Sequence, residues 1–141
     1  MRYVLDSSVA LKWVIAEADS GRAVRLRDEY RAGIHELLAP DLFTPEVANA
    51  LVAAERQARI KKGESALLLC DIAVTAPVFL ATGPLLLRGM EIALATRQAV
   101  YDCVYVALAE RDGCELVTAD DRLVRSLQPS FPFVVSLVSL P

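Results

Sequence analysis

The chain has 141 residues, of which 55% are hydrophobic, and its formal net charge is −3. This length and composition exclude intrinsic disorder, and we expect a single domain over residues 1–141 with a sizeable core. The mildly acidic charge argues against sequence-blind nucleic-acid binding driven by global charge, although it allows a local basic rim beside an acidic centre.

Membrane, disulfide and histidine chemistry are also disfavoured. No apolar run approaches the roughly 20 residues of a membrane span, and the first strand pattern begins without a charged leader, so we expect a cytoplasmic protein. The odd set of Cys70, Cys103 and Cys114 lacks metal-type spacing and indicates reduced, mostly buried thiols. Because His35 is the only histidine, carboxylates must carry most of any catalysis.

The chain begins with a strand pattern that turns directly into a helix pattern. Tyr3, Val4 and Leu5 form an apolar run with strand preference, and apolar residues at helical spacing follow from Val9. Asp6 stands between the two, just outside the carboxyl end of the strand, where chemistry gathers in open α/β sheets. The alternative is that Asp6 only caps the following helix.

Strands and helices then alternate along the chain. We expect helix 19–31, strand 37–39, helix 44–60, helix 64–74, strand 78–80, helix 85–96, helix 100–110, strand 115–118, helix 121–127 and edge strand 133–135. Gly89 is a weak point within its helix. This order predicts an α/β fold with a central, mostly parallel sheet flanked by helices on both faces (α/β/α).

The helix predicted over 19–31 is strongly basic. Its arginines are Arg22, Arg25, Arg27 and Arg31. They fit a solvated face bridged to neighbouring acids, and this is the interpretation that we favour. In the alternative, Arg22 and Arg25 guide a polyanion toward the protein by electrostatic attraction.

Glu46 lies in the first turn of the helix that Thr44 is placed to cap, with Pro45 at its first position. A capping box needs Glu or Gln three residues after the cap, and that position is Val47. Glu46 is therefore not needed for the reciprocal cap bond. The helix dipole favours an anion there.

Further acids occupy comparable positions. Asp102 lies near the start of an almost wholly apolar helix, and Asp120 repeats the strand-end position of Asp6. Asp121 is best explained as a cap or first-turn acid of the next helix. Right-handed crossovers place strand ends and helix starts on one side of a parallel sheet, so we expect Asp6, Glu46, Asp102 and Asp120 to share a pocket.

Such a cluster needs protons or cations. Two carboxylates about 4 Å apart repel by roughly 4 kcal/mol at an effective dielectric near 20, and several such pairs rival the stability of a domain. Oxygen-only ligands suit Mg²⁺ or Mn²⁺, which can activate water for an in-line phosphoryl displacement.

These residues lie in four segments that carry a family resemblance. They are Leu5-Asp6-Ser7-Ser8-Val9, Pro45-Glu46-Val47-Ala48-Asn49-Ala50-Leu51, Tyr101-Asp102-Cys103-Val104-Tyr105-Val106-Ala107-Leu108-Ala109 and Val117-Thr118-Ala119-Asp120. In order and spacing they resemble PIN-domain ribonucleases, specifically the VapC-type toxins of bacterial and archaeal toxin–antitoxin pairs. Each segment alone is a weak signal, whereas the ordered set is a strong one.

The resemblance implies a role for each matching residue. Asp6, Glu46, Asp102 and Asp120 match the family's catalytic and metal-binding acids, and Ser7 and Thr118 match its supporting hydroxyls. Because Asp121 duplicates the acid beside Asp120, it is a further supporting candidate.

The resemblance also implies the activity and its partners. The expected reaction is Mg²⁺- or Mn²⁺-dependent cleavage of single-stranded or loop RNA, such as tRNA or rRNA loops, that leaves a 5′-phosphate and a 3′-hydroxyl. A homodimer and a VapB-like antitoxin, whose tail blocks the acidic pocket, are the expected partners.

Other functions fit less well. A phosphoaspartate enzyme of the haloacid-dehalogenase type wants a second Asp two residues after the first, where this chain has Ser8. A response-regulator receiver wants paired early acids and a late strand-end Lys, and neither is present. The main alternative is a catalytically inactive PIN-like module that only binds a protein. The presence of all four acids argues against lost catalysis.

Overall fold

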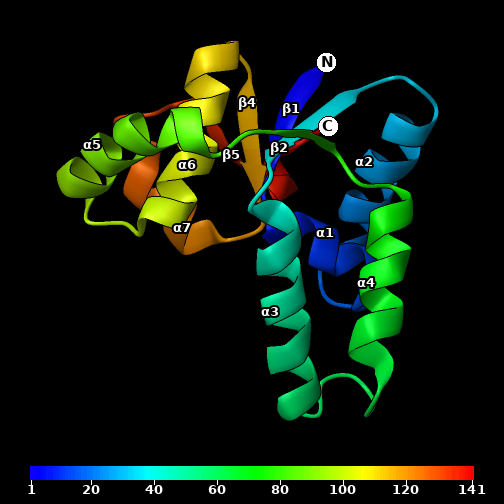
Figure 1. Cartoon of the computed structure of the whole chain (residues 1–141). Coiled ribbons are helices and arrows are strands. Elements are labelled where there is room, and N and C mark those ends of the chain that lie inside the picture. Colours follow the sequence, from blue (N-terminus) through cyan, green and yellow to red (C-terminus); the bar gives the residue numbers. More distant parts are fainter.

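The computed structural model describes all residues, 1–141, and contains one five-stranded sheet. Its strands are β1 (Arg2–Leu5), β2 (Glu36–Pro40), β3 (Val78–Leu80), β4 (Glu115–Thr118) and β5 (Val134–Ser136). They lie in the order β3-β2-β1-β4-β5, and every neighbouring pair is parallel (Figure 1). The predicted parallel sheet is therefore confirmed, with β5 at an edge.

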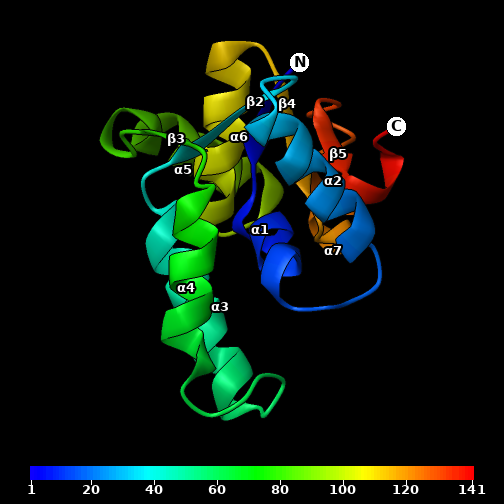
Figure 2. The same cartoon turned by 90° about the vertical axis from the view of Figure 1, so that its right-hand side faces the viewer.

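Helices cover both faces of this sheet. They are α1 (Ser7–Val14), α2 (Ser20–Arg31), α3 (Phe43–Arg56), α4 (Glu64–Val74), α5 (Leu86–Thr96), α6 (Val100–Asp112) and α7 (Asp121–Leu127), with short 3₁₀ turns at Gly83–Leu85 and Leu137–Ser139. Helices α1, α2 and α4 lie on one side of the sheet and α5, α6 and α7 on the other (Figures 1 and 2). This confirms the expected α/β/α architecture. None of these helices has the length and apolar character needed to cross a bilayer.

Strand β1 is the centre of the sheet, and its composition explains why. Val4 and Leu5 are fully buried, as a strand covered on both faces requires. The backbone N–H of Asp6 donates to the carbonyl of Val117 at 3.0 Å, which continues the pairing with β4 one residue beyond the strand. The end of β1 is thereby fixed beside the end of β4.

Helix α6 is the most buried helix, because it packs between the sheet and α5. Residues 103–109 are all buried. Helix α5 approaches α6 closely at Gly89, where a Cβ atom would stand 3.2 Å from Cγ2 of Val104. Gly89 is therefore the contact that allows these two helices to pack, and its cost in helix propensity is offset there.

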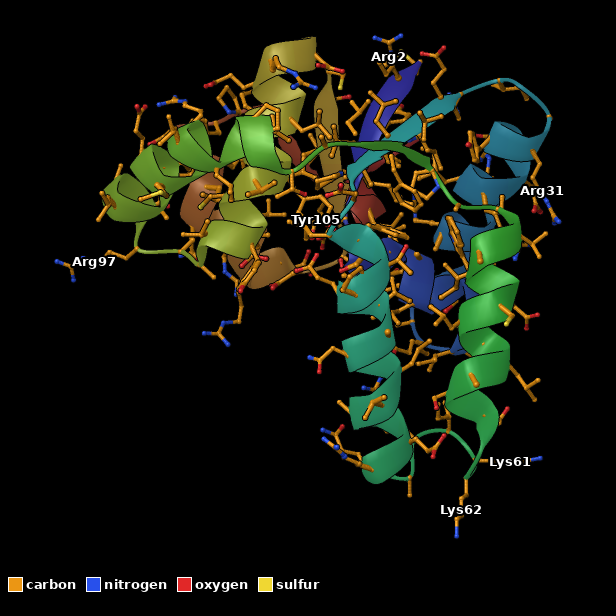
Figure 3. All side chains as sticks on the ribbon, viewed as in Figure 1. Arg2, Arg31, Lys61, Lys62, Arg97 and Tyr105 are labelled. Carbon is orange, nitrogen blue, oxygen red and sulfur yellow. The ribbon has the colours of Figure 1, made fainter.

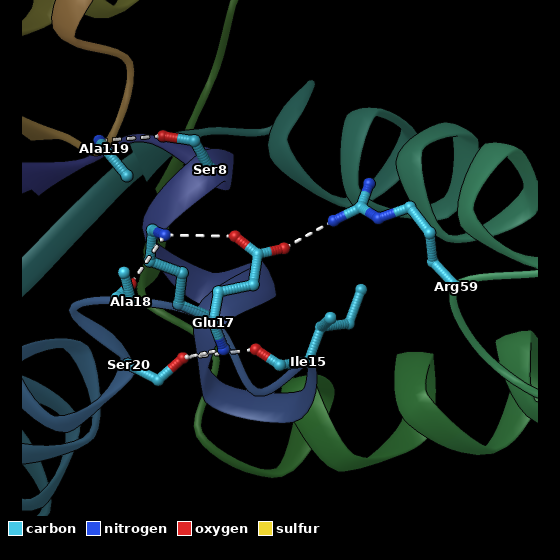
Figure 4. A network of polar contacts seen from close by, with 8 residues as sticks. Ser8, Ile15, Glu17, Ala18, Ser20, Arg59 and Ala119 are labelled. Atoms are coloured by element: carbon cyan, nitrogen blue, oxygen red, sulfur yellow. Dashed lines mark hydrogen bonds and ion pairs between the residues drawn. The ribbon is translucent and has the colours of Figure 1, made fainter. Parts of the chain in front are cut away.

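Helices α3 and α4 form a hairpin that projects beyond the sheet (Figures 1 and 2). The segment after α1 is tied to this hairpin through Glu17, which pairs with Lys12 and, across the chain, with Arg59 (Figure 4). Ser20 closes the same segment, because its Oγ accepts the N–H of Glu17 at 2.9 Å and donates to the carbonyl of Ile15 at 3.2 Å.

The ends of α3 differ from the sequence prediction. The helix begins at Phe43 with Leu42 at the N-cap position and has no side-chain cap, so the assignment of Thr44 as its cap is wrong. It ends at Arg56 rather than near residue 60, since the backbone of Ala58 adopts a positive φ of 56°. The earlier start places Glu46 within the first turn.

Candidate active site

Asp6 lies between β1 and α1 and is only 7% exposed. It occupies the N-cap position of α1, but its carboxylate makes no capping hydrogen bond. Instead, its Oδ2 accepts hydrogen bonds from Ser8 Oγ at 2.5 Å and from Thr118 Oγ1 at 2.8 Å. Capping therefore does not explain an acid at this position.

The two hydroxyls that hold Asp6 are themselves oriented by backbone groups of the chain after β4. Ser8 Oγ accepts the N–H of Ala119 at 3.0 Å (Figure 4), and Thr118 Oγ1 accepts the N–H of Asp120 at 3.1 Å. Each hydroxyl accepts from the backbone and so directs its own proton to Asp6. The carboxylate is thus held through one oxygen, while no hydrogen bond engages Oδ1.

Burial raises the pKa of the Asp6 carboxyl above its ordinary value. The hydrogen bonds from Ser8 and Thr118 favour the ionised form and lower the pKa, whereas the nearby charge of Asp120 raises it. Burial has the largest effect, so Asp6 is a buried acid without a cationic partner.

Glu46 comes from the first turn of α3 and is half-buried. Its Oε1 accepts a hydrogen bond from the hydroxyl of Tyr105 at 2.6 Å. The pKa of Glu46 is raised from 4.5 to about 7, first by burial and then by the charges of Asp6 and Asp102, against the lowering effect of the Tyr105 hydrogen bond. The carboxylate therefore lies within the field of two other candidate acids.

Asp102, in the first turn of α6, is also half-buried and makes no hydrogen bond or ion pair through its side chain. Its pKa is raised from 3.8 to about 6, mainly by burial and also by the charges of Asp6 and Asp120. A carboxylate without a partner at the start of a buried helix is stabilised only by the helix dipole and needs a compensating charge.

Asp120 and Asp121 have different roles. Asp120 is the N-cap of α7, because its Oδ1 accepts the N–H groups of Arg122 at 3.0 Å and Leu123 at 3.1 Å. Asp121 is a first-turn acid whose Oδ1 accepts from Ser136 Oγ on β5 at 2.8 Å. Only Asp120 affects the pKa of Asp6 and Asp102, so it is the acid that faces the cluster.

The four predicted acids therefore come together at one edge of the sheet. In five of the six possible pairs among these acids, the charge of one acid raises the pKa of the other. As the side chains stand, no group of three or more His, Cys, Asp or Glu is arranged to ligate one metal ion. Ligation by three of them requires their side chains to rearrange, although an oxygen-only donor set suits a hard divalent cation.

Two residues of this site were missed by the sequence prediction. Ser8, and not Ser7, supports Asp6 together with Thr118, whereas the hydroxyl of Ser7 acts to lower the pKa of Tyr105. The sequence offers two adjacent serines, and only the direction of the chain at the start of α1 distinguishes them. The spacing of Tyr105, three residues after Asp102, places both on one helix face and was the available signal.

Arg22 and Arg25 do not lie beside the four acids. Arg22 donates to the carbonyl of Leu140 at 2.6 Å, and Arg25 forms an ion pair with Glu29 at 2.8 Å. Both line a surface cavity of about 920 Å³ together with Tyr3, in the amino-terminal half of β1. Asp6 lies beyond the carboxyl end of the same strand. The ion pair of Arg25 agrees with the solvated face, bridged to neighbouring acids, that we favoured from the sequence.

The chain is similar to known proteins of one family. The PIN domain profile matches residues 3–126. The chain belongs to the PIN-domain family. Ribonuclease VapC3 of Pyrobaculum aerophilum is 30% identical over 138 residues, which cover 96% of this chain and 99% of that protein. The resemblance to VapC-type PIN proteins is thereby confirmed.

Two solved structures share the fold of this PIN protein. The crystal structure of PAE2754 from Pyrobaculum aerophilum matches with a TM-score of 0.69 and 22% sequence identity. The match covers 99% of this chain and 94% of the PAE2754 chain. VapBC2 from Rickettsia felis, bound to a DNA fragment from its promoter, has a TM-score of 0.61 and 13% identity, with coverage of 96% and 97%. At these identities the likeness concerns the fold alone.

The raised carboxyl pKa values predict an unusual dependence of stability on pH. In the folded chain Glu46 and Asp102 hold their protons up to about pH 7 and about pH 6, whereas the unfolded chain releases them near the ordinary values of 4.5 and 3.8. Their stabilising contribution is therefore complete below the unfolded pKa values and is lost as the pH rises through the folded ones. In chelator, the melting temperature should fall by several degrees from about pH 5 to about pH 8.

The control for this prediction is the variant Glu46→Gln, which cannot titrate. Its melting temperature should fall less steeply over the same range, as measured by circular dichroism. A wild-type melting temperature that stays level or rises between these pH values would contradict the electrostatic description of the cluster.

Proposed function

We propose that this chain is a VapC-type endoribonuclease, the toxin of a toxin–antitoxin pair, and that it hydrolyses RNA with the help of Mg²⁺ or Mn²⁺. The observation that supports this most strongly is the cluster of four acids from distant segments, three of which have raised pKa values. Membership of the PIN-domain family and the similarity to Ribonuclease VapC3 also support a nuclease function.

The hydrogen bonds of the acids suit a cation. Asp6, Glu46 and Asp120 are each held through one oxygen, and the second oxygen has no hydrogen-bond partner. Oxygen ligands that are fixed on one side and free on the other are what a hard divalent ion requires. Asp102, without any side-chain partner, completes the set of proposed ligands.

The ion, when bound, supplies an activated water and offsets the charge that develops on the phosphate. The chain's own residues determine where this happens. Ser8 and Thr118 orient Asp6, the backbone of α7 orients Asp120, and Tyr105 holds Glu46. The scissile phosphate would have to lie beside these acids, at the carboxyl ends of β1 and β4. Without the ion, the same charges would repel it.

Removal of a proposed ligand should abolish cleavage while the fold persists. Asp6→Asn and Asp102→Asn each keep the side-chain shape and remove the charge, so we expect RNA cleavage to fall by more than about 100-fold, because a ligand contributes more than the groups around it. The measurement is a single-turnover assay on an RNA hairpin in Mn²⁺, with circular dichroism to check folding.

The same variants should also lose ion-dependent stability. Millimolar Mn²⁺ should raise the melting temperature of the wild type at neutral pH, since the ion binds the native state, and this increase should be smaller in either variant. Full cleavage activity in a well-folded Asp6→Asn protein would falsify the assignment. If the chain is instead a catalytically inactive binding module, Mn²⁺ titration calorimetry of the wild type and of Asp6→Asn should show no difference in ion binding.

A comparison of Asp120→Asn with Asp121→Asn distinguishes the neighbouring acids. Asparagine caps a helix about as well as aspartate, so α7 should persist in the first variant. We expect cleavage to fall by about tenfold or more in Asp120→Asn, as for a residue that holds a metal site, and to change less than about twofold in Asp121→Asn. Equal losses in both variants would argue against assigning the site to Asp120.

RNA is proposed to approach from the side to which the carboxyl ends of the strands point. Lys61 and Lys62 lie at the tip of the α3–α4 hairpin on this side, whereas Arg2 lies at the opposite end of the molecule (Figure 3). Neither lysine forms an ion pair. They are therefore free to neutralise phosphate.

A pair of double variants tests this approach. Lys61→Ala with Lys62→Ala should weaken RNA binding and reduce its salt dependence by about two ions, because two phosphate contacts are lost. Arg22→Ala with Arg25→Ala removes the same charge from the other end of the sheet and should leave both quantities unchanged. A salt slope that falls only in the arginine variant would restore these arginines as the guide.

The proposed partners are a second copy and a VapB-like antitoxin. Leu87, Met90 and Leu94 form an exposed apolar stripe on α5, at 78%, 49% and 83% exposure. Such a stripe fits a homodimer interface. The antitoxin is inferred from the VapC relative, and its tail is proposed to block the acids.

A further inference from the structure

We propose that Tyr105 is a positioning residue, which fixes Glu46 so that its free oxygen can serve a divalent cation. This inference rests on the proposed nuclease function and deepens it. Tyr105 is only 1% exposed and belongs to the hydrophobic core, and the inference gives this core residue a role in the active site.

The geometry that carries the inference connects two helices. Tyr105 stands three residues after Asp102 on α6, so both side chains lie on one helix face. Its hydroxyl donates to Oε1 of Glu46, on α3, at 2.6 Å. Figure 3 shows Tyr105 at the junction between α6 and the first turn of α3. The ring is buried in the core, and its polar end is directed into the acid cluster.

A second hydroxyl acts on Tyr105. Ser7, the first residue of α1, opposes the rise in the pKa of the Tyr105 hydroxyl that burial causes. The hydrogen bond itself runs from Tyr105 to Glu46 and joins α6 to α3. Ser7 therefore influences Tyr105, whereas Ser8 is the serine that holds Asp6.

Glu46 needs such a partner more than the other anchored acids do. Asp6 is held by two hydroxyls and Asp120 by two backbone N–H groups, whereas the hydroxyl of Tyr105 is the only hydrogen-bond donor to Glu46. Glutamate also has one more rotatable bond than aspartate, so its carboxylate loses more conformational freedom when it is fixed. Without the hydroxyl, the charges of Asp6 and Asp102 would favour rotation of Glu46 away from the cluster.

The direct test removes this hydroxyl alone. Tyr105→Phe should weaken Mn²⁺ binding by about 10- to 100-fold in titration calorimetry, the usual cost of losing a group that orients a metal ligand. Tyr101→Phe is the matched control, because Tyr101 lies on the same helix, is 66% exposed and makes no hydrogen bond. It should bind Mn²⁺ as the wild type does.

Cleavage kinetics separate positioning from a general structural role. In Tyr105→Phe, the Mn²⁺ concentration that gives half-maximal cleavage should rise by about 10- to 100-fold, in step with the loss of affinity. The rate at saturating Mn²⁺ should return to within about threefold of wild type. A residue that only supports the core would instead lower the maximal rate and leave the Mn²⁺ requirement unchanged, and this result would overturn the inference.

A second variant covers the case in which Tyr105→Phe folds poorly. Ser7→Ala leaves the buried ring in place and removes the neighbouring hydroxyl that acts on Tyr105, so it should weaken Mn²⁺ binding in the same direction, by several-fold. Wild-type affinity in both variants refutes the role of Tyr105 but leaves the proposed nuclease intact. A wild-type chain that neither binds Mn²⁺ nor cleaves RNA overturns both.

Discussion

Mutual repulsion among carboxylates is the constraint on which the arrangement of this site depends. Two such groups about 4 Å apart repel by about 4 kcal/mol at an effective dielectric near 20, which is a large part of the stability of a small domain. The chain places four of them at one edge of its sheet without a cationic side chain among them. Burial is the largest cause of the raised pKa values of Asp6, Glu46 and Asp102, and the charges of neighbouring acids raise each of them further.

The rest of the fold can be understood as the support that holds these acids in place. Parallel strands bring the ends of β1 and β4 together, and the N–H of Asp6 bonded to Val117 fixes their register. The buried helix α6, which lies on the face of the sheet opposite to α1, contributes Asp102 and Tyr105. One oxygen of each anchored acid is bound to groups that belong to the fold, so the acids cannot simply turn outward to water. The second oxygen of each anchored acid makes no hydrogen bond.

The sequence was sufficient for the fold and for the proximity of the four acids, because both depend on patterns that are local or periodic. Alternating strand and helix patterns imply a parallel sheet, and a parallel sheet gathers residues that follow its strands. Helix α4 and strands β3 and β4 have the bounds that the sequence indicated. The family resemblance added the function that these patterns alone leave open.

What the sequence did not reveal depends on contacts between distant segments. The choice between Ser7 and Ser8 is decided by Thr118 and Ala119, more than a hundred residues away. The partnership of Tyr105 with Glu46 spans 59 residues. The start of α3 at Phe43 overrode the local preference for a cap at Thr44, since packing of buried Phe43 contributes more than one capping bond.

Asp120 shows how one residue can serve structure and site together. Its Oδ1 accepts two N–H groups at the start of α7, and a cap of this kind is worth about 1 kcal/mol. The charge of the same carboxylate also raises the pKa of Asp6 and of Asp102. An acid that both caps a helix and faces a cluster keeps its position when the cluster is repulsive, because leaving would cost the cap. A single carboxylate therefore couples the stability of α7 to the electrostatics of the acid cluster.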